Sequence, residues 1–97
     1  MIELTKSSRV AYESLKSPDK ENFMRLYKSD DDLDMILRCY GARKLPDIEN
    51  TYILNLSDQL RAIVRILGDK IIVLEIVKSE TLRRIFSSVK KGENIYS

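Results

Sequence analysis

The stretch QLRAIVRILGDKIIVLEIVK, Gln59–Lys78, decides the fold, because it contains two apolar runs separated by a Gly-Asp pair. A glycine followed by a polar residue between two such runs predicts a two-residue β-hairpin turn, with Gly68 at the position that needs a positive φ. The first run is interrupted by Arg61 and Arg65. Two interpretations of these arginines are open: side chains that reach solvent at the edge of a sheet, or the cationic part of an anion-binding sheet face.

The turn at Gly68 also predicts which residues face each other across the hairpin. Leu67 is expected opposite Lys70, which places Arg65 opposite Ile72, Ile63 opposite Leu74 and Arg61 opposite Ile76. Side chains alternate between the two faces of a strand, so one face collects the better core residues. These are Leu60, Ala62, Val64, Ile66, Ile71, Val73 and Val77. The other face, which we call the arginine face, is expected to carry Asn55, Arg61, Ile63, Arg65, Ile72, Leu74, Ile76 and Lys78.

The residues before the hairpin predict a strand, then helices, then another strand. Met1–Thr5 alternates apolar and polar residues, as a short strand does. Ser7 and Ser8 can cap a first helix, Ser17 with Pro18 can begin a second, and Gly41 can end a third. These helices are expected over about residues 9–15, 18–27 and 33–40. Residues 52–56 alternate again and join the core face through a short turn at 57–59.

After the hairpin, residues 79–91 predict a terminal helix with Ser79 as its N-cap. Its apolar stripe consists of Leu82, Ile85, Phe86 and Val89, and we expect it to cover part of the arginine face. The whole chain, residues 1–97, is therefore predicted to form one α+β domain. In this domain an N-terminal strand and a helical hairpin pack on a twisted antiparallel sheet with a C-terminal meander.

Composition limits the function. The chain has 97 residues, 43% hydrophobic and 33% charged, which suits one small core. Charges interrupt every long apolar run, and Glu3 and Lys6 lie where a secretory signal would be apolar, so we expect a cytoplasmic protein with no membrane contact. Cys39 is the one cysteine and there is no histidine, which argues against a disulfide, a zinc site or Cys/His catalysis. We expect no cofactor and no metal.

Charge is unevenly distributed, although the net charge is only +2. Residues 1–50 contain nine Lys and Arg against ten Asp and Glu, whereas residues 51–97 contain eight against five. A nucleic-acid contact and a solvated helix face both fit this surplus. The acidic run at 30–34 lacks the glycine of a calcium loop and is expected to begin a helix. The basic residues at and after the last strand are Lys78, Arg83, Arg84, Lys90 and Lys91.

This order of elements resembles the RelE/ParE toxin superfamily. The resemblance is carried by residues 44–86, KLPDIENTYILNLSDQLRAIVRILGDKIIVLEIVKSETLRRIF. The family pattern has a leucine in the loop before a Tyr-x-hydrophobic strand, here Leu45 and Tyr52. An arginine that opens an apolar middle strand follows, here Arg61, and then a strand rich in valine and isoleucine. The resemblance implies a RelE-like fold and a toxin that a cognate antitoxin protein holds inactive.

The resemblance implies two different activities. RelE-type members are ribosome-dependent endoribonucleases that cleave mRNA and inhibit translation, whereas ParE-type members inhibit DNA gyrase without the same catalytic residues. Arg61 matches the family's catalytic arginine, and Lys78 could replace the arginine expected near Glu80. Ile53 and Asn55 occupy the places of the family's lysines, and Phe86 replaces its aromatic residue without a hydroxyl group. The residues expected to bind nucleic acid are Arg65, Arg83, Arg84, Lys90 and Lys91.

Three functions therefore remain open from the sequence. The first is an mRNA endoribonuclease toxin that uses Arg61 with Lys78. The second is a non-catalytic toxin or binding protein that acts on DNA gyrase. The third is a family member that acts only by forming a complex.

Overall fold

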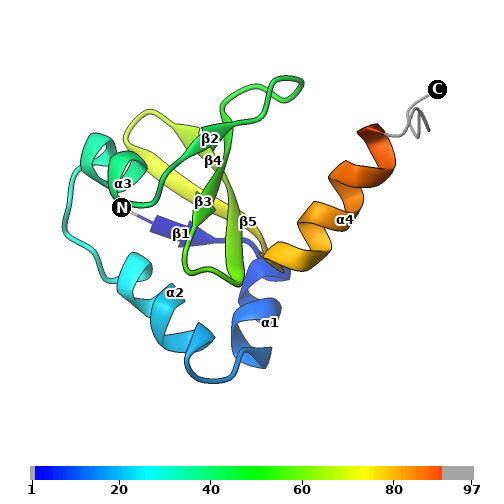
Figure 1. Ribbon diagram of the computed structural model, residues 1–97. Coiled ribbons are helices and arrows are strands. Elements are labelled where there is room, and N and C mark those ends of the chain that lie inside the picture. Colours follow the sequence, from blue (N-terminus) through cyan, green and yellow to red (C-terminus); the bar gives the residue numbers. More distant parts are fainter. Residues whose placement is uncertain (1, 91–97) are drawn as a thin grey trace.

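The computed structural model describes residues 2–90, with side chains described for residues 2–84. Within these residues, five strands form one sheet in the order β1-β5-β4-β3-β2, and four helices accompany it (Figure 1). The strands are β1 Ile2–Leu4, β2 Arg43–Lys44, β3 Thr51–Asn55, β4 Leu60–Leu67 and β5 Lys70–Lys78. The helices are α1 Lys6–Ser14, α2 Asp19–Tyr27, α3 Leu33–Cys39 and α4 Ser79–Lys90.

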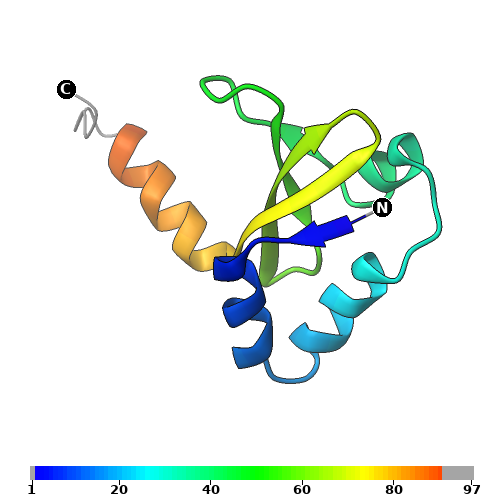
Figure 2. The same cartoon turned by 180° about the vertical axis from the view of Figure 1, so that it is seen from behind.

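The predicted α+β architecture is confirmed. β2, β3, β4 and β5 form an antiparallel meander, and β1 joins its edge parallel to β5. Helices α1 to α3 lie together beside one face of the sheet, whereas α4 leads away from them in both views (Figures 1 and 2). None of the described helices combines the length and apolar character that crossing a bilayer requires.

The core lies between the sheet and α1 to α3. Phe23 and Leu26 from α2 and Ile36 from α3 are buried against β3, β4 and β5. The predicted core face of β4 is confirmed, because its residues at even positions from 60 to 64 are all buried. The members of this core cluster from β3, β4, β5 and the turn after β3 are Leu54, Leu56, Leu60, Ala62, Val64, Ile71, Val73 and Ile76.

Two helices begin differently from the sequence-based expectation. α1 begins at Lys6 because Thr5, rather than Ser7 or Ser8, is its N-cap: the Ser8 amide donates to Thr5 Oγ1 at 3.1 Å. α2 begins at Asp19, with Pro18 at the N-cap position. The hydroxyl of Ser17 donates instead to the Glu21 carboxylate at 2.9 Å.

The third helix follows its sequence signals closely. The Met35 amide donates to the Asp32 carboxylate at 2.9 Å, so Asp32 caps α3 as the acidic run predicts. At the other end, Gly41 has φ 55 and the Ala42 amide donates to the Leu37 carbonyl at 2.9 Å, which is a Schellman ending. A Cβ at position 41 would lie 3.0 Å from the Asn55 side chain, so glycine serves both backbone and packing here.

The central hairpin has the predicted turn, but its register changes partway along. Gly68 has φ 63, Leu67 pairs with Lys70 and Arg65 pairs with Ile72, as expected. Beyond Val64 a β-bulge adds one residue to β5, so Ile63 pairs with Glu75 and Arg61 pairs with Val77. The predicted pairings of Ile63 with Leu74 and of Arg61 with Ile76 are therefore wrong.

The bulge exchanges the two faces of β5 over its last residues. Ile76 is buried in the core where Val77 was expected, and Val77 lies opposite Arg61 on the other face. Lys78 pairs with the buried Leu60 and therefore lies on the helix side of the sheet. The expectation that Ile76 and Lys78 belong to the arginine face is wrong. Side chains alternate between the two faces of a strand, so one inserted residue moves each following side chain to the opposite face.

Hydrogen bonds from Thr5, which lies between β1 and α1, and from Ser7 in the first turn of α1 secure the bulge. The Thr5 amide donates to the Val73 carbonyl at 3.1 Å, and the Thr5 hydroxyl donates to the Leu74 carbonyl at 3.2 Å. The Ser7 hydroxyl donates to the Glu75 carboxylate at 2.7 Å. The extra residue of the bulge thus has hydrogen-bond partners that lie about 70 positions earlier in the sequence.

Lys78 forms an ion pair with Asp19 at the start of α2. The Asp19 side chain is only 11% exposed, whereas the Lys78 side chain is 54% exposed. A carboxylate in the first turn also interacts favourably with the helix dipole. This pair joins the end of β5 to α2, so Lys78 helps to hold the helical layer in place.

The terminal helix does not lie where the sequence suggested. α4 follows β5 directly at Ser79 and projects away from the body of the domain, so the expectation that it covers part of the arginine face is wrong (Figures 1 and 2). The Ser79 amide donates to the Gln59 carbonyl at 2.9 Å. The Ser79 hydroxyl donates to the Asp58 carbonyl, also at 2.9 Å. These bonds attach the start of α4 to the turn between β3 and β4.

We predict that Thr5→Val lowers the free energy of unfolding by about 1–2 kcal/mol, because it removes the α1 cap and the hydrogen bond to the bulge together. Urea denaturation followed by circular dichroism measures the change. Thr81→Val is the control, because Thr81 is exposed and its substitution should stay within about 0.5 kcal/mol. Equal effects of the two substitutions would contradict the role given to Thr5.

We also predict that Lys78→Gln lowers the free energy of unfolding by about 1 kcal/mol, because it leaves the nearly buried Asp19 carboxylate without its cation. Lys70→Gln is the matched control, since the Lys70–Glu3 pair at 2.9 Å is about half exposed on both sides and should contribute little. A double-mutant cycle with Asp19→Asn measures the coupling directly. A coupling energy of zero would contradict the placement of Lys78.

Candidate functional site

The arginine face is the sheet surface opposite α1 to α3. Residues that pair directly across antiparallel strands share a face, so the observed register gives its membership. β4 contributes Arg61, Ile63 and Arg65, and β5 contributes Ile72, Glu75 and Val77. The neighbouring strands contribute Thr51, Ile53, Asn55 and Arg43. The face thus combines apolar side chains with three guanidinium groups and one carboxylate, that of Glu75, which accepts a hydrogen bond from Ser7.

Arg61 is half-buried near the start of β4, where it pairs with Asn55 and Val77. Its Nη1 group donates to the Ser57 carbonyl and, at 3.1 Å, to the Leu60 carbonyl. It forms no ion pair with any carboxylate of the described residues. The guanidinium is therefore fixed at one end by backbone oxygens and does not form an ion pair with a described carboxylate.

The carboxylates that could have neutralised the arginines are engaged elsewhere. Glu75 accepts the hydrogen bond from Ser7, and Glu80 pairs with Arg84 at 3.3 Å along α4. Arg65 is exposed and, within residues 2–84, has no ion pair. Neither Arg61 nor Arg65 is therefore part of an ion pair with a described carboxylate.

Arg43 is a third cation of this face, and it was not singled out from the sequence. It pairs with Ile53, which pairs in turn with Ile63, so Arg43 lies in the same row of the sheet two strands away from β4. Arg61 and Arg65 lie two residues before and after Ile63. The three arginines thus form a triangle with sides on the order of 10 Å, from strand spacings of about 4.8 Å and a rise of about 3.4 Å per residue.

The remaining residues expected to act are not gathered at this triangle. Lys78 lies on the helix side, paired with Asp19, and so does not share a face with Arg61. Arg83 and Arg84 are exposed on α4, where Arg84 is within reach of Glu80. Lys90 ends α4 and its side chain lies outside the described residues, as does the whole of Lys91.

Ile53 and Asn55, which occupy the places of the lysines in RelE-type enzymes, contribute no charge to the arginine face. Ile53 is 5% exposed and Asn55 is exposed but neutral.

Burial raises the pKa of the Tyr40 phenol above its usual value, and nearby Arg25 only partly offsets this effect, so Tyr40 stays protonated at neutral pH. The arrangement can therefore bind a phosphate group and stabilise negative charge on it, mainly through Arg61.

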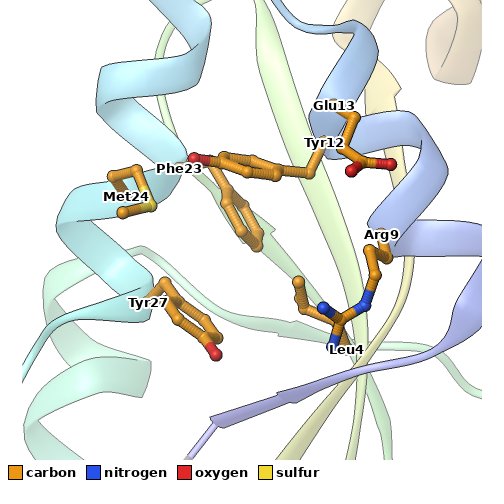
Figure 3. Close-up of a pocket in the computed structure, with 7 residues that line it drawn as sticks. All are labelled: Leu4, Arg9, Tyr12, Glu13, Phe23, Met24 and Tyr27. Atoms are coloured by element: carbon orange, nitrogen blue, oxygen red, sulfur yellow. The ribbon is translucent and has the colours of Figure 1, made fainter.

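A hollow of about 180 Å³ lies on the opposite side of the sheet, between α1 and α2 (Figure 3). In Figure 3 the side chains of Arg9 and Tyr27 extend toward each other from opposite walls. Phe23 lies at its base, with ring centroids 5.3 Å from Tyr12 and 6.3 Å from Tyr27. The hollow is thus an aromatic surface separate from the arginine face.

Within the described part of the chain, no group of His, Cys, Asp and Glu side chains could hold a metal ion.

No protein-family model matches the sequence, and no curated protein sequence matches it. Solved structures do match. The crystal structure of an archaeal RelE-RelB complex from Pyrococcus horikoshii OT3 is similar with a TM-score of 0.64 and 17% identity, over 79% of this chain and 91% of that chain.

Two structures from Helicobacter pylori are also similar. The solution structure of a conserved hypothetical protein has a TM-score of 0.57 at 14% identity, over 81% of this chain and 93% of that one. A copper-bound mutant toxin has a TM-score of 0.51 at 11% identity, over 84% of this chain and 96% of that one. At these identities the similarity concerns the fold, and the chain has the RelE-like fold that its sequence predicted.

Proposed function

We propose that this protein is the toxin component of a type II toxin-antitoxin system that acts on mRNA at the ribosome, in the cytoplasm, as an endoribonuclease. The observation that carries the proposal is Arg61, whose guanidinium is anchored to backbone carbonyls on the arginine face with no carboxylate partner among the described residues. The RelE-like fold supports the toxin assignment. Fold alone does not assign an activity, so the proposed nuclease activity depends on the residues of the arginine face.

The arginine triangle suits an extended polyanion better than a small ligand. Arg43, Arg61 and Arg65 come from two strands and lie on the order of 10 Å apart, so no single phosphate group could contact all three. Guanidinium groups donate two parallel hydrogen bonds to phosphate and keep their charge at every physiological pH. A single strand of RNA laid across the face would place successive phosphates near successive arginines.

The proposed chemistry is the attack of a ribose 2′-oxygen on the adjacent phosphorus. The bond from phosphorus to the 5′-oxygen breaks, and the products are a 2′,3′-cyclic phosphate and a 5′-hydroxyl. Negative charge accumulates on the phosphoryl oxygens in the transition state, and Arg61 would stabilise it from a fixed position. Arg65 and Arg43 would hold the flanking phosphates, and the exposed Arg83 on α4 would offer a further cation to the RNA.

An antitoxin partner follows from the same proposal. The structural match from Pyrococcus horikoshii is a complex of RelE with RelB. A toxin with an uncovered cationic surface also requires a partner that blocks it in the cell. We propose that a cognate antitoxin binds this chain and covers its active surface.

A second function is favoured by one specific observation. Ile53 and Asn55 leave the arginine face without the lysines of RelE-type enzymes, and Lys78 does not replace them because it faces α2. A non-catalytic toxin that binds a protein such as DNA gyrase, or a protein that acts only by complex formation, would need no such lysines.

We predict that Arg61→Gln weakens the binding of single-stranded RNA and lowers the salt dependence of that binding. Each lost phosphate contact should reduce the slope of log affinity against log salt by roughly 0.7. Fluorescence anisotropy with a labelled oligoribonucleotide at several salt concentrations measures both quantities. Arg43→Gln and Arg65→Gln should each give smaller effects in the same direction.

Arg38→Gln is the matched control, because Arg38 is an exposed arginine on α3, a helix that packs on the opposite side of the sheet through Ile36. It removes the same charge and should leave the salt slope unchanged. Thermal melting checks that every variant is folded. If Arg38→Gln and Arg61→Gln weaken binding equally, the contact is general charge attraction and the site is not on the arginine face.

Primer extension on mRNA from cells that express the protein separates the two functions. The endoribonuclease should produce new 5′ ends within coding regions, and Arg61→Gln should abolish them. Growth arrest without such ends, accompanied by a DNA-damage response while translation continues, would instead assign the protein to the gyrase alternative.

A further inference from the structure

The turn between β3 and β4 is attached to the first residue of α4. The Ser79 amide donates to the Gln59 carbonyl, and the Ser79 hydroxyl donates to the Asp58 carbonyl, both at 2.9 Å. One residue thus fixes two consecutive carbonyls of this turn. Two hydrogen bonds from one residue to consecutive carbonyls also restrict the orientation of the peptide plane between them.

The same turn holds the guanidinium of Arg61. Arg61 Nη1 donates to the carbonyl of Ser57, which immediately precedes the two carbonyls that Ser79 fixes. The Leu60 carbonyl also accepts from Arg61 and, at 2.9 Å, from the Leu56 amide. Ser79 and Arg61 therefore bond neighbouring carbonyls of one turn, and the backbone at 57–60 links the two sets of hydrogen bonds.

We propose that Ser79 is a positioning residue for Arg61, acting through the backbone of the turn at 57–59. Its importance for activity rests on the proposed function, whereas its effect on Arg61 does not. A guanidinium has five N–H donors, and the described bonds use only Nη1. With Nη1 held by the turn, the donors on Nε and Nη2 are left for a ligand on the arginine face.

The arrangement also links α4 to the site. Ser79 lies where β5 ends and α4 begins, so a rotation of α4 about this point would move the Asp58 and Gln59 carbonyls. A group held by such a fixed set of hydrogen bonds requires little reorganisation when it binds charge. Loss of the Ser79 hydroxyl should therefore loosen Arg61 without removing its charge.

The test is the NMR signal of the Arg61 side-chain Nε–H group, recorded on the full chain without RNA. We expect Ser79→Ala to shift this signal and to increase its exchange with water several-fold. Ser79→Thr, which keeps the hydroxyl, should restore the wild-type signal. Ser14→Ala is the matched control, because it removes a serine hydroxyl bonded only to the Val10 carbonyl of α1 and should leave Arg61 unchanged.

A merely structural role for Ser79 would lower the melting temperature without moving the Arg61 signal, and that result would overturn the proposal. So would a Ser79→Thr variant that behaves like Ser79→Ala. Affinity for the labelled oligoribonucleotide then tests the link to function: Ser79→Ala should weaken binding and Ser79→Thr should not. If Arg61→Gln also fails to change affinity, the proposed function is wrong while the NMR result still decides the role of Ser79.

Discussion

The structure depends on one irregularity, the bulge that adds Leu74 to β5 opposite Ile63. Without it, strict alternation would bury Val77, expose Ile76 and place Lys78 beside Arg61. With it, Ile76 enters the core and Lys78 reaches Asp19 on α2. The bulge persists because Thr5 donates hydrogen bonds to two consecutive carbonyls of the bulged segment, those of Val73 and Leu74. The link between β1 and α1 therefore decides which charges each face of the sheet carries.

This division separates the ion pair that stabilises the helical layer from the surface that we propose to bind RNA. On the helix side, the lysine at the end of β5 compensates a nearly buried carboxylate and holds α2 in place. On the arginine face, Arg61, Arg65 and Arg43 share a surface whose nearby carboxylates are engaged by Ser7, Lys70 and Arg84. Similarity to solved structures at 11–17% identity concerns the fold alone, so the chemistry of the arginine face depends on its own residues.

The sequence predicts the features that depend on local chemistry. The Gly68 turn, the core face of β4 and both ends of α3 follow from glycine conformation, period-two alternation and capping. It could not predict the bulge, because the hydrogen bonds that secure it come from Thr5, about 70 residues away. Within the site, Arg61 and Arg65 were found from the pattern, whereas Arg43 was missed because a two-residue strand has no measurable period.

The register of the hairpin is the most direct test of this account, because every assignment of a residue to a face follows from it. Cross-strand nuclear Overhauser contacts between β4 and β5, measured on isotope-labelled protein, give the register residue by residue. The account predicts contacts of Ile63 with Glu75 and of Arg61 with Val77. Contacts of Ile63 with Leu74 and of Arg61 with Ile76 would show an unbulged hairpin, and Lys78 would then share the arginine face.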